Sequence, residues 1–264
     1  LIGVITLAAF ARRQLRLPRP LIDFRLLSTT PIAIGILIAL VASMTLIGFE
    51  LVLSQRLQLV LGQSPLEAGA FVLPISLGSF VAGPFAGALI GRIGCARVIA
   101  AGLAMCALGM WAYLVLNDAN TWAQVISLAL CGVGIGSSLT ASSTLVMSNV
   151  SEDRAGMAGS VEGVAYEFGA GFGVTIFGSL MTAIYVAHVR GSGIETMAGS
   201  SLDDAHRYVQ NHAQAQPILQ GAMQAFEAAF NTVSSVVIAT LLALATLVLL
   251  LSLKWGKSQK PMLT

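Results

Sequence analysis

Three glutamates lie inside long apolar stretches of the sequence, where ionisable side chains are rare: Glu50, Glu162 and Glu167. A charged side chain at the centre of a bilayer costs roughly 2.5–3.5 kcal/mol on insertion scales, so such residues normally face a bundle interior or water. A carboxyl group that takes up a proton near neutral pH is what proton coupling requires. Arg56 is the one basic residue near these acids that could neutralise them.

Glu167 is the strongest candidate of the three for meeting a proton or a cation. It stands about nine residues into its apolar stretch, which is roughly 14 Å deep and close to the midplane of a bilayer. Tyr166 and Phe168 flank it, and aromatic rings can stack on a cationic ligand. Simple packing is the alternative role for both rings.

Glu162 is five residues from Glu167, about 140° around a helix, so the two carboxyl groups cannot share one face. Glu162 aligns with glycines, and a row of small residues favours close contact between helices. These helix-packing glycines are Gly159, Gly163, Gly169 and Gly173. A structural hydrogen bond within that contact is the alternative to a coupling role for Glu162.

Glu50 comes 19 residues after Pro31, which places it about 28 Å along an ideal helix, towards the outer third of a bilayer. A second coupling role and a carboxylate that reaches the outer interface beside Gln55 and Arg56 are both consistent with this position. Gln55 is a further candidate for substrate contact.

These acids must be held by membrane-spanning helices, because hydrophobic residues make up 56% of the 264 and charged residues only 10%. A soluble domain carries roughly 25% charged residues. The composition therefore predicts an all-α polytopic membrane protein and excludes an ordinary cytosolic enzyme or a nucleic-acid binder with a basic face. The predicted spans are 31–53, 68–90, 98–116, 122–147, 157–187 and 228–253.

The remaining segments connect or flank these spans. Residues 1–11 are predicted to be the end of a truncated transmembrane helix, 12–30 a cytoplasmic linker, and 254–264 a cytoplasmic tail. This orientation leaves 11 of the 14 basic residues in the cytoplasm and 3 outside, in agreement with the positive-inside rule. We therefore expect a multi-pass protein of a bacterial-type cytoplasmic (inner) membrane.

The outer loop, 188–227, is predicted to form a helical hairpin. Ser201 to Asp204 has the form of a capping box with Asp in place of Glu, and Pro217 is suited to the first turn of a second helix. A gating lid and a plain connector both fit this hairpin.

Several motifs concern packing rather than chemistry. Gly83 and Pro84 are predicted to bend the second span and to let a neighbouring helix approach. Gly132, Gly134 and Gly136 in the fourth span are predicted to serve mainly close packing. The three cysteines have no paired spacing, so neither a disulfide framework nor a metal site is expected.

The turn after the second span resembles a known motif. Gly87-Ala-Leu-Ile-Gly-Arg-Ile-Gly94, followed by Arg97, is similar to the G-x-L-x-D-R-x-G-R-R loop of the major facilitator superfamily. Gly87, Leu89, Arg92 and Gly94 match, whereas Gly91 replaces the motif aspartate. The stretches Gln58 to Pro74 and Ala155 to Gly178 resemble the drug:proton antiporter branch with about 14 spans. The pairing of Gly48-Phe-Glu50 with Ala165-Tyr-Glu167 resembles the methyl viologen and quaternary-ammonium exporters of that branch.

The resemblance implies the six-helix C-terminal half of a major facilitator fold, preceded by the end of another helix. It also implies a proton-coupled multidrug antiporter that exports lipophilic or quaternary cations. Such a protein uses the proton gradient and no cofactor. Its expected partners are membrane lipid, the missing N-terminal half, small lipophilic cations and protons, with no nucleic acid.

Three other interpretations of the chain's function remain as alternatives to the antiporter. The chain could be a truncated membrane fragment without transport activity, a helical scaffold, or a facilitator for neutral solutes on the same fold. An enzyme is not expected, because the sequence has no H-E-x-x-H, G-x-S-x-G or cofactor loop.

Overall fold

The computed structural model describes residues 29–116, 120–192, 194, 199–212 and 216–256, together with residues 3, 5, 6, 9, 12 and 13. Side chains are not described at positions 211 and 254–256. Most of the predicted helix end at 1–11, of the linker at 12–30 and of the tail at 254–264 lies outside these residues.

Almost all of the described residues are helical, and none of them belongs to a strand. The elements follow the order α2 (Thr30–Gln55), η2 (Arg56–Val60), α3 (Pro65–Ile93), α4 (Cys95–Val115), α5 (Thr121–Met147), η3 (Glu152–Arg154), α6 (Ala155–Ser192), α8 (Leu202–Asn211) and α9 (Gln216–Gly256). Among the described residues, six helices are long and apolar enough to cross a membrane. The predicted all-α polytopic fold is thereby confirmed. α6 and α9 are longer than the predicted spans 157–187 and 228–253.

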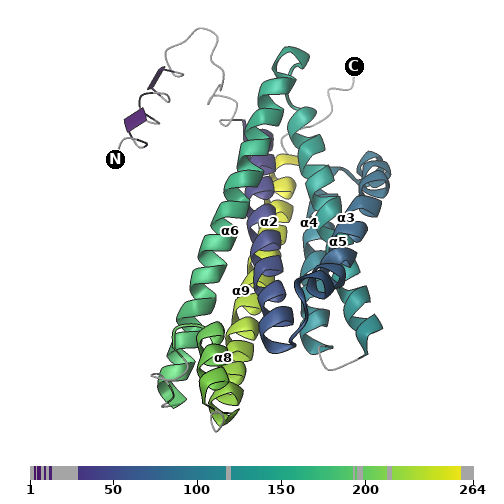
Figure 1. The fold of residues 1–264 in the computed structure, drawn as a ribbon. Coiled ribbons are helices and arrows are strands. Elements are labelled where there is room, and N and C mark those ends of the chain that lie inside the picture. Colours follow the sequence, from purple (N-terminus) through teal and green to yellow (C-terminus); the bar gives the residue numbers. More distant parts are fainter. Residues whose placement is uncertain are drawn as a thin grey trace, which may run out of the picture.

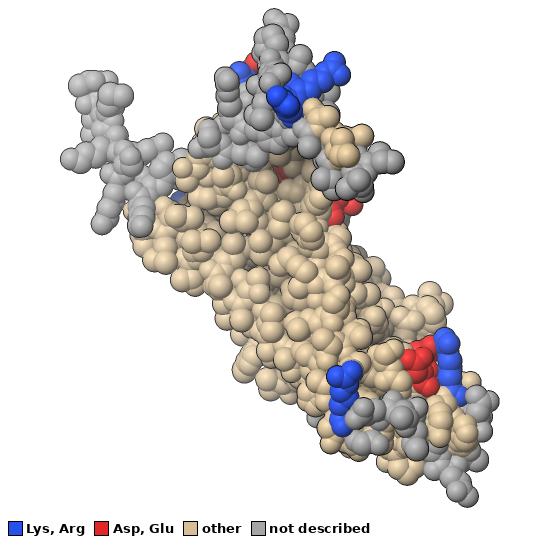
Figure 2. Space-filling view, turned by 90° about the vertical axis from the view of Figure 1, so that its left-hand side faces the viewer, with Lys and Arg blue, Asp and Glu red and all other residues tan. Residues whose placement is uncertain are grey.

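The long helices divide into α3, α4 and α5 on one side and α2 and α6 on the other, with α9 between these two groups (Figure 1). α5 packs against both α3 and α4, while α2 runs beside α6, and α9 joins the groups by contacting α4 and α6. α2 begins and α9 ends at one end of the bundle, called here the Arg97 end, and α8 lies at the opposite end, the α8 end. Acidic and basic side chains gather near the two ends of the face in Figure 2, with a broad uncharged band between them. This distribution is that of a protein whose middle lies in hydrocarbon.

Glycines of α5 bring its backbone against both neighbours. A Cβ at Gly132 would overlap the carbonyl oxygen of Ile75 in α3, and a Cβ at Gly134 would overlap the backbone nitrogen of Cys106 in α4. Only a residue without a side chain permits such an approach. The predicted packing role of Gly132, Gly134 and Gly136 is confirmed.

Gly83 and Pro84 make no close backbone contact with another described helix, and their packing role stays a prediction. A Cβ at Gly83 would have only Thr140 Oγ1 nearby, at an ordinary 3.7 Å, and Pro84 is exposed within α3. The contact with α5 is made by Gly78 on a different face of α3, where Ala82 and Ala86 are also buried.

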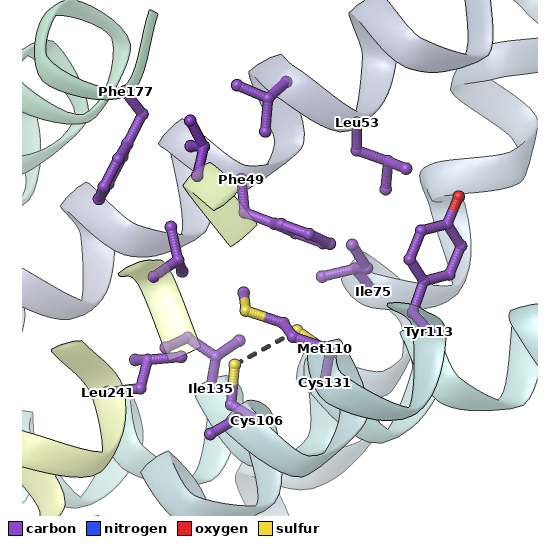
Figure 3. Packing of buried hydrophobic residues seen from close by; sticks show 14 of the residues in the cluster. Phe49, Leu53, Ile75, Cys106, Met110, Tyr113, Cys131, Ile135, Phe177 and Leu241 are labelled. Atoms are coloured by element: carbon purple, nitrogen blue, oxygen red, sulfur yellow. Dashed lines mark hydrogen bonds between the residues drawn. The ribbon is translucent and has the colours of Figure 1, made fainter. Parts of the chain in front are cut away.

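The core between the two groups is apolar and contains two of the three cysteines (Figure 3). The Sγ atoms of Cys106 and Cys131 lie 3.3 Å apart, and both residues are fully buried. Phe49 of α2 packs edge-on against Tyr113 of α4, with ring centroids 6.4 Å apart. Because the two cysteines are 25 residues apart on different helices, the sequence spacing did not indicate their contact.

The predicted hairpin helix is present as α8, and Pro217 lies in the first turn of α9. The Ser201 hydroxyl accepts a hydrogen bond from the backbone N–H of Asp204 at 3.3 Å, and the Asp204 carboxylate accepts one from the backbone N–H of Ser200 at 3.2 Å. Hydrogen bonding to Ser201, and then to Ser200, lowers the pKa of Asp204, so the cap is ionised at neutral pH. His206 Nε2 lies 2.9 Å from the carbonyl oxygen of Leu59, which joins α8 to η2.

Candidate functional site

Glu162 is a buried, fully hydrogen-bonded carboxyl group between α5 and α6. Its side chain is 3% exposed. Oε2 accepts a hydrogen bond from the Ser143 hydroxyl at 3.1 Å, and Oε1 accepts one from the Tyr166 hydroxyl at 3.0 Å. The sequence did not identify Ser143 as a partner of Glu162. The geometry gives Glu162 the structural hydrogen bonds that were the alternative to a coupling role.

The row of glycines beside Glu162 is only partly a packing surface. Gly169 and Gly173 lie against the backbone carbonyl oxygens of Leu40 and Met44 in α2. The prediction is wrong for Gly163. A Cβ added at this position would have no neighbour within 4 Å, because the residue is turned about 100° from Glu162 onto the exposed face. Gly159 has only an ordinary contact, 3.4 Å to Met147 Cε.

Glu167 lies on the opposite face of α6, which no described helix covers. Its side chain is exposed and forms no hydrogen bond or ion pair with any other described residue. Gly171, Gly178 and Thr182 fall on the same side of the helix. A shallow groove of about 510 Å³ begins two turns further along this side, lined by Val174, Thr175, Gly178, Ser179, Thr182 and Ala183.

The two aromatic neighbours of Glu167 differ in their surroundings. The Tyr166 hydroxyl is occupied by Glu162, and the ring is half-buried. Phe168 is 56% exposed, and its ring centroid lies 6.0 Å from that of Phe172 on the same helix. Of the two rings, only that of Phe168 presents a free surface to a ligand beside Glu167.

Glu50 is half-buried on α2 and lies far from the other two acids. α2 and α6 run parallel, and Gly169 is level with Leu40. Glu50 is therefore roughly 18 Å nearer the α8 end than Glu167. Gln55 is partly exposed in the last turn of α2. The structure therefore does not gather the candidate residues into one cluster.

An ion pair that sequence reasoning missed ties three elements together near the α8 end. Arg56 Nε lies 2.8 Å from Oε1 and 2.9 Å from Oε2 of Glu227 in α9. Its Nη1 donates to the Tyr113 hydroxyl at 3.1 Å, and its guanidinium carbon lies 5.2 Å from the ring centroid of Phe230. Arg56 is 6% exposed, so it is buried among these elements. A possible signal was the lone acid Glu227, directly before the final apolar run.

The loop-motif residues surround the turn at the Arg97 end. Gly94 joins α3 to α4 with a φ of +85°, a conformation that favours glycine. Arg92 and Arg97 are exposed on either side of this turn, and neither forms an ion pair within the described part of the chain. Gly87 has no close neighbour and Leu89 is exposed. Among the matched residues, only Gly94 has a conformational reason for its identity.

The replacement Tyr166→Phe is expected to lower the free energy of unfolding by about 1–3 kcal/mol, because one oxygen of the buried Glu162 loses its donor. The measurement is chemical unfolding of the purified chain in detergent micelles. Ser160→Ala serves as the control, because this exposed hydroxyl bonds only to Gly156 O of its own helix. An unchanged stability in Tyr166→Phe would show that the hydrogen bond is not formed.

The described residues include six helices that can span a membrane. On α6, the carboxyl group of Glu162 is hydrogen-bonded on one face, and that of Glu167 lies on a face that no described helix covers. These features define a polytopic helical membrane protein with a polar site facing away from its own core. The sequence model of the family described as Major Facilitator Superfamily matches residues 5–189. The chain belongs to this superfamily.

The relatives of the chain carry names of drug-resistance and export proteins rather than of enzymes. It is 39% identical over 235 residues to the methyl viologen resistance protein SmvA of Salmonella typhimurium, covering 86% of this chain and 47% of SmvA. It is 32% identical over 255 residues to the multidrug efflux pump LfrA of Mycolicibacterium smegmatis, covering 92% of this chain and 50% of LfrA. The chain thus spans about half the length of these relatives. The expected drug-exporter branch of the superfamily is confirmed.

Proposed function

We propose that the chain forms the C-terminal half of a proton-coupled antiporter that exports lipophilic cations. The other half would come from the remainder of a protein as long as the relatives. The position of Glu167 carries this proposal. This carboxyl group lies about 18 Å along α6 from Ala155, on the face that no described helix covers. In a two-halved transporter, substrate and coupling sites lie near the midplane between the halves.

The chemistry around Glu167 suits a cation and a proton that compete for one carboxylate. A carboxylate attracts a cationic ligand, and the exposed Phe168 and Phe172 rings, one turn apart, offer faces on which it can stack. Protonation of the carboxyl group removes that attraction and releases the cation. The groove of small and hydroxyl side chains from Val174 to Ala183 supplies a path towards the α8 end.

The other two acids have lesser roles in this proposal. Both oxygens of Glu162 are occupied by Ser143 and Tyr166, so this residue positions α6 against α5. Glu50 has no hydrogen-bond partner among the described residues and is the second candidate for proton transfer, nearer the α8 end.

The relatives support the choice of substrate. SmvA is named for resistance to methyl viologen, a dication, and LfrA for multidrug efflux. The excess of basic residues, 11 against 3, supports an orientation in an inner membrane with the Arg97 end and the C-terminus in the cytoplasm.

In the protein expressed from the full reading frame that contains this chain, Glu167→Gln is expected to reduce the efflux of methyl viologen at least about ten-fold. A glutamine keeps the size of the side chain but neither attracts a cation nor releases a proton. The measurement is uptake of the compound into everted (inside-out) vesicles, with and without an imposed pH gradient.

Glu152→Gln is the matched control, because this exposed carboxylate lies in η3 at the Arg97 end, near the start of α6. Its efflux should equal that of the unmodified protein. Efflux by Glu167→Gln with unchanged rate and pH dependence would contradict the carboxylate assignment. Export by the unmodified protein that ignores the pH gradient would indicate a facilitator, and no export at all would favour a scaffold.

A further inference from the structure

An amphipathic cavity of about 720 Å³ lies at the Arg97 end, between the turn that joins α3 to α4 and the last turns of α9. Much of its wall is apolar and includes residues of three helices: Ile34 of α2, Leu145 of α5 and Val248 of α9. This volume is within the range of about 300–1,000 Å³ typical of small-molecule sites. None of these lining residues belongs to the groove beside Glu167.

The rim of the cavity is positively charged. Arg97 is the one charged side chain among the described lining residues, and no described acid lines the cavity. The first turn of α4 adds to this charge, because Gly94 has no side chain with which to cap the first backbone N–H groups. An anionic group at the rim would therefore be attracted, and a cationic drug would be repelled.

The depth of the cavity matches the boundary between headgroups and acyl chains. Ile34 lies four residues from the start of α2 and Val248 eight residues from the end of α9, roughly 6 and 12 Å along these helices from their ends at the Arg97 end. Leu249 and Leu253 also line the cavity and are 41% and 65% exposed, so its α9 side is not covered by other described helices. An acyl chain can enter from the bilayer without crossing a polar barrier.

We propose that this cavity binds one anionic phospholipid of the surrounding bilayer, with its phosphate at Arg97 and an acyl chain along Leu145 and Val248. The apolar depth favours a lipid over free phosphate, which would use only the rim. The proposal does not depend on the exported substrate. It gives Arg97 of the loop motif a ligand outside the protein, where Gly91 replaces the aspartate of the superfamily motif.

Native mass spectrometry of the purified chain in detergent tests this site, with phosphatidylglycerol and phosphatidylcholine of identical acyl chains as probes. We expect one tightly retained phosphatidylglycerol. Arg97→Gln should weaken its binding about five-fold, because a basic residue near a lipid surface contributes on the order of 1 kcal/mol. Arg92→Gln is the matched control, since Arg92 is exposed at the same turn but does not line the cavity.

A second pair of variants tests the apolar part of the site. Leu249→Trp fills the α9 side of the cavity and should remove binding of both lipids, whereas Leu250→Trp, the exposed neighbour that does not line the cavity, should leave binding unchanged. Equal phosphatidylglycerol binding by Arg97→Gln and the unmodified chain would overturn the proposal. So would displacement of the lipid by inorganic phosphate, or binding seen only after removal of residues 257–264, which would make the tail the occupant.

Discussion

Replacing Gly132 with leucine is expected to destabilise the chain by more than about 3 kcal/mol, because the new side chain has no space between α5 and α3. A Cβ at this position would already overlap the carbonyl oxygen of Ile75, which is backbone and cannot rotate away. The two helices must separate, and the separation also disturbs the nearby contact between Gly136 and Ser79. The measurement is chemical unfolding of the purified chain in detergent.

Gly163→Leu is the matched control for this prediction. It makes the same chemical change in a membrane-spanning helix, at a glycine where an added Cβ would have no neighbour within 4 Å. Its stability should be unchanged or higher by about 0.5–1 kcal/mol, because glycine is a poor helix former. Equal stability of the two leucine variants would contradict the backbone contact between α3 and α5.

Glu227→Gln is expected to lower the free energy of unfolding by about 3–5 kcal/mol, because it leaves the buried guanidinium of Arg56 without a counter-ion. The Tyr113 hydroxyl and the Phe230 ring would remain near Arg56, but neither carries a negative charge. The same unfolding measurement applies.

The double variant Arg56→Met/Glu227→Leu separates the charge from the packing. Because both charges are removed together, it should regain most of the stability lost in Glu227→Gln. Asp203→Asn is the control: its ion pair with Arg207 is exposed, and such pairs contribute about 1 kcal/mol or less. If Glu227→Gln were as stable as Asp203→Asn, Arg56 would not depend on its pair.

The number and order of the spans could be predicted from the sequence because each is a long apolar run, and the links between the first five are short and charged. The helix ends were less predictable. α9 begins at Gln216, ahead of its long apolar run, because its first turns mix polar residues with buried apolar ones such as Ala222 and Phe226, and these turns pack beside α8. α6 likewise continues to Ser192, past the predicted boundary.

The site was predictable in its candidate residues but not in their partners. The five-residue spacing of Glu162 and Glu167 was enough to separate their faces, yet it could not show which face is covered. The hydrogen bond from Ser143 to Glu162, the pair of Arg56 with Glu227 and the contact of Cys106 with Cys131 all join different helices. Helical periodicity orders residues around one axis and contains no information about which neighbour supplies the partner.

The lengths of α6 and α9 fix how far the protein stands above the bilayer. At 1.5 Å per residue, their 38 and 41 residues extend for about 57 and 62 Å, nearly twice the 30 Å of hydrocarbon. The first twelve residues of α9 precede its apolar run, and α8 packs against them. The α8 end is therefore a helical extension that projects into water and is continuous with two spans. An antibody fragment that binds this helical extension would move rigidly with α6. It would therefore report directly on the orientation of the helix that carries Glu167.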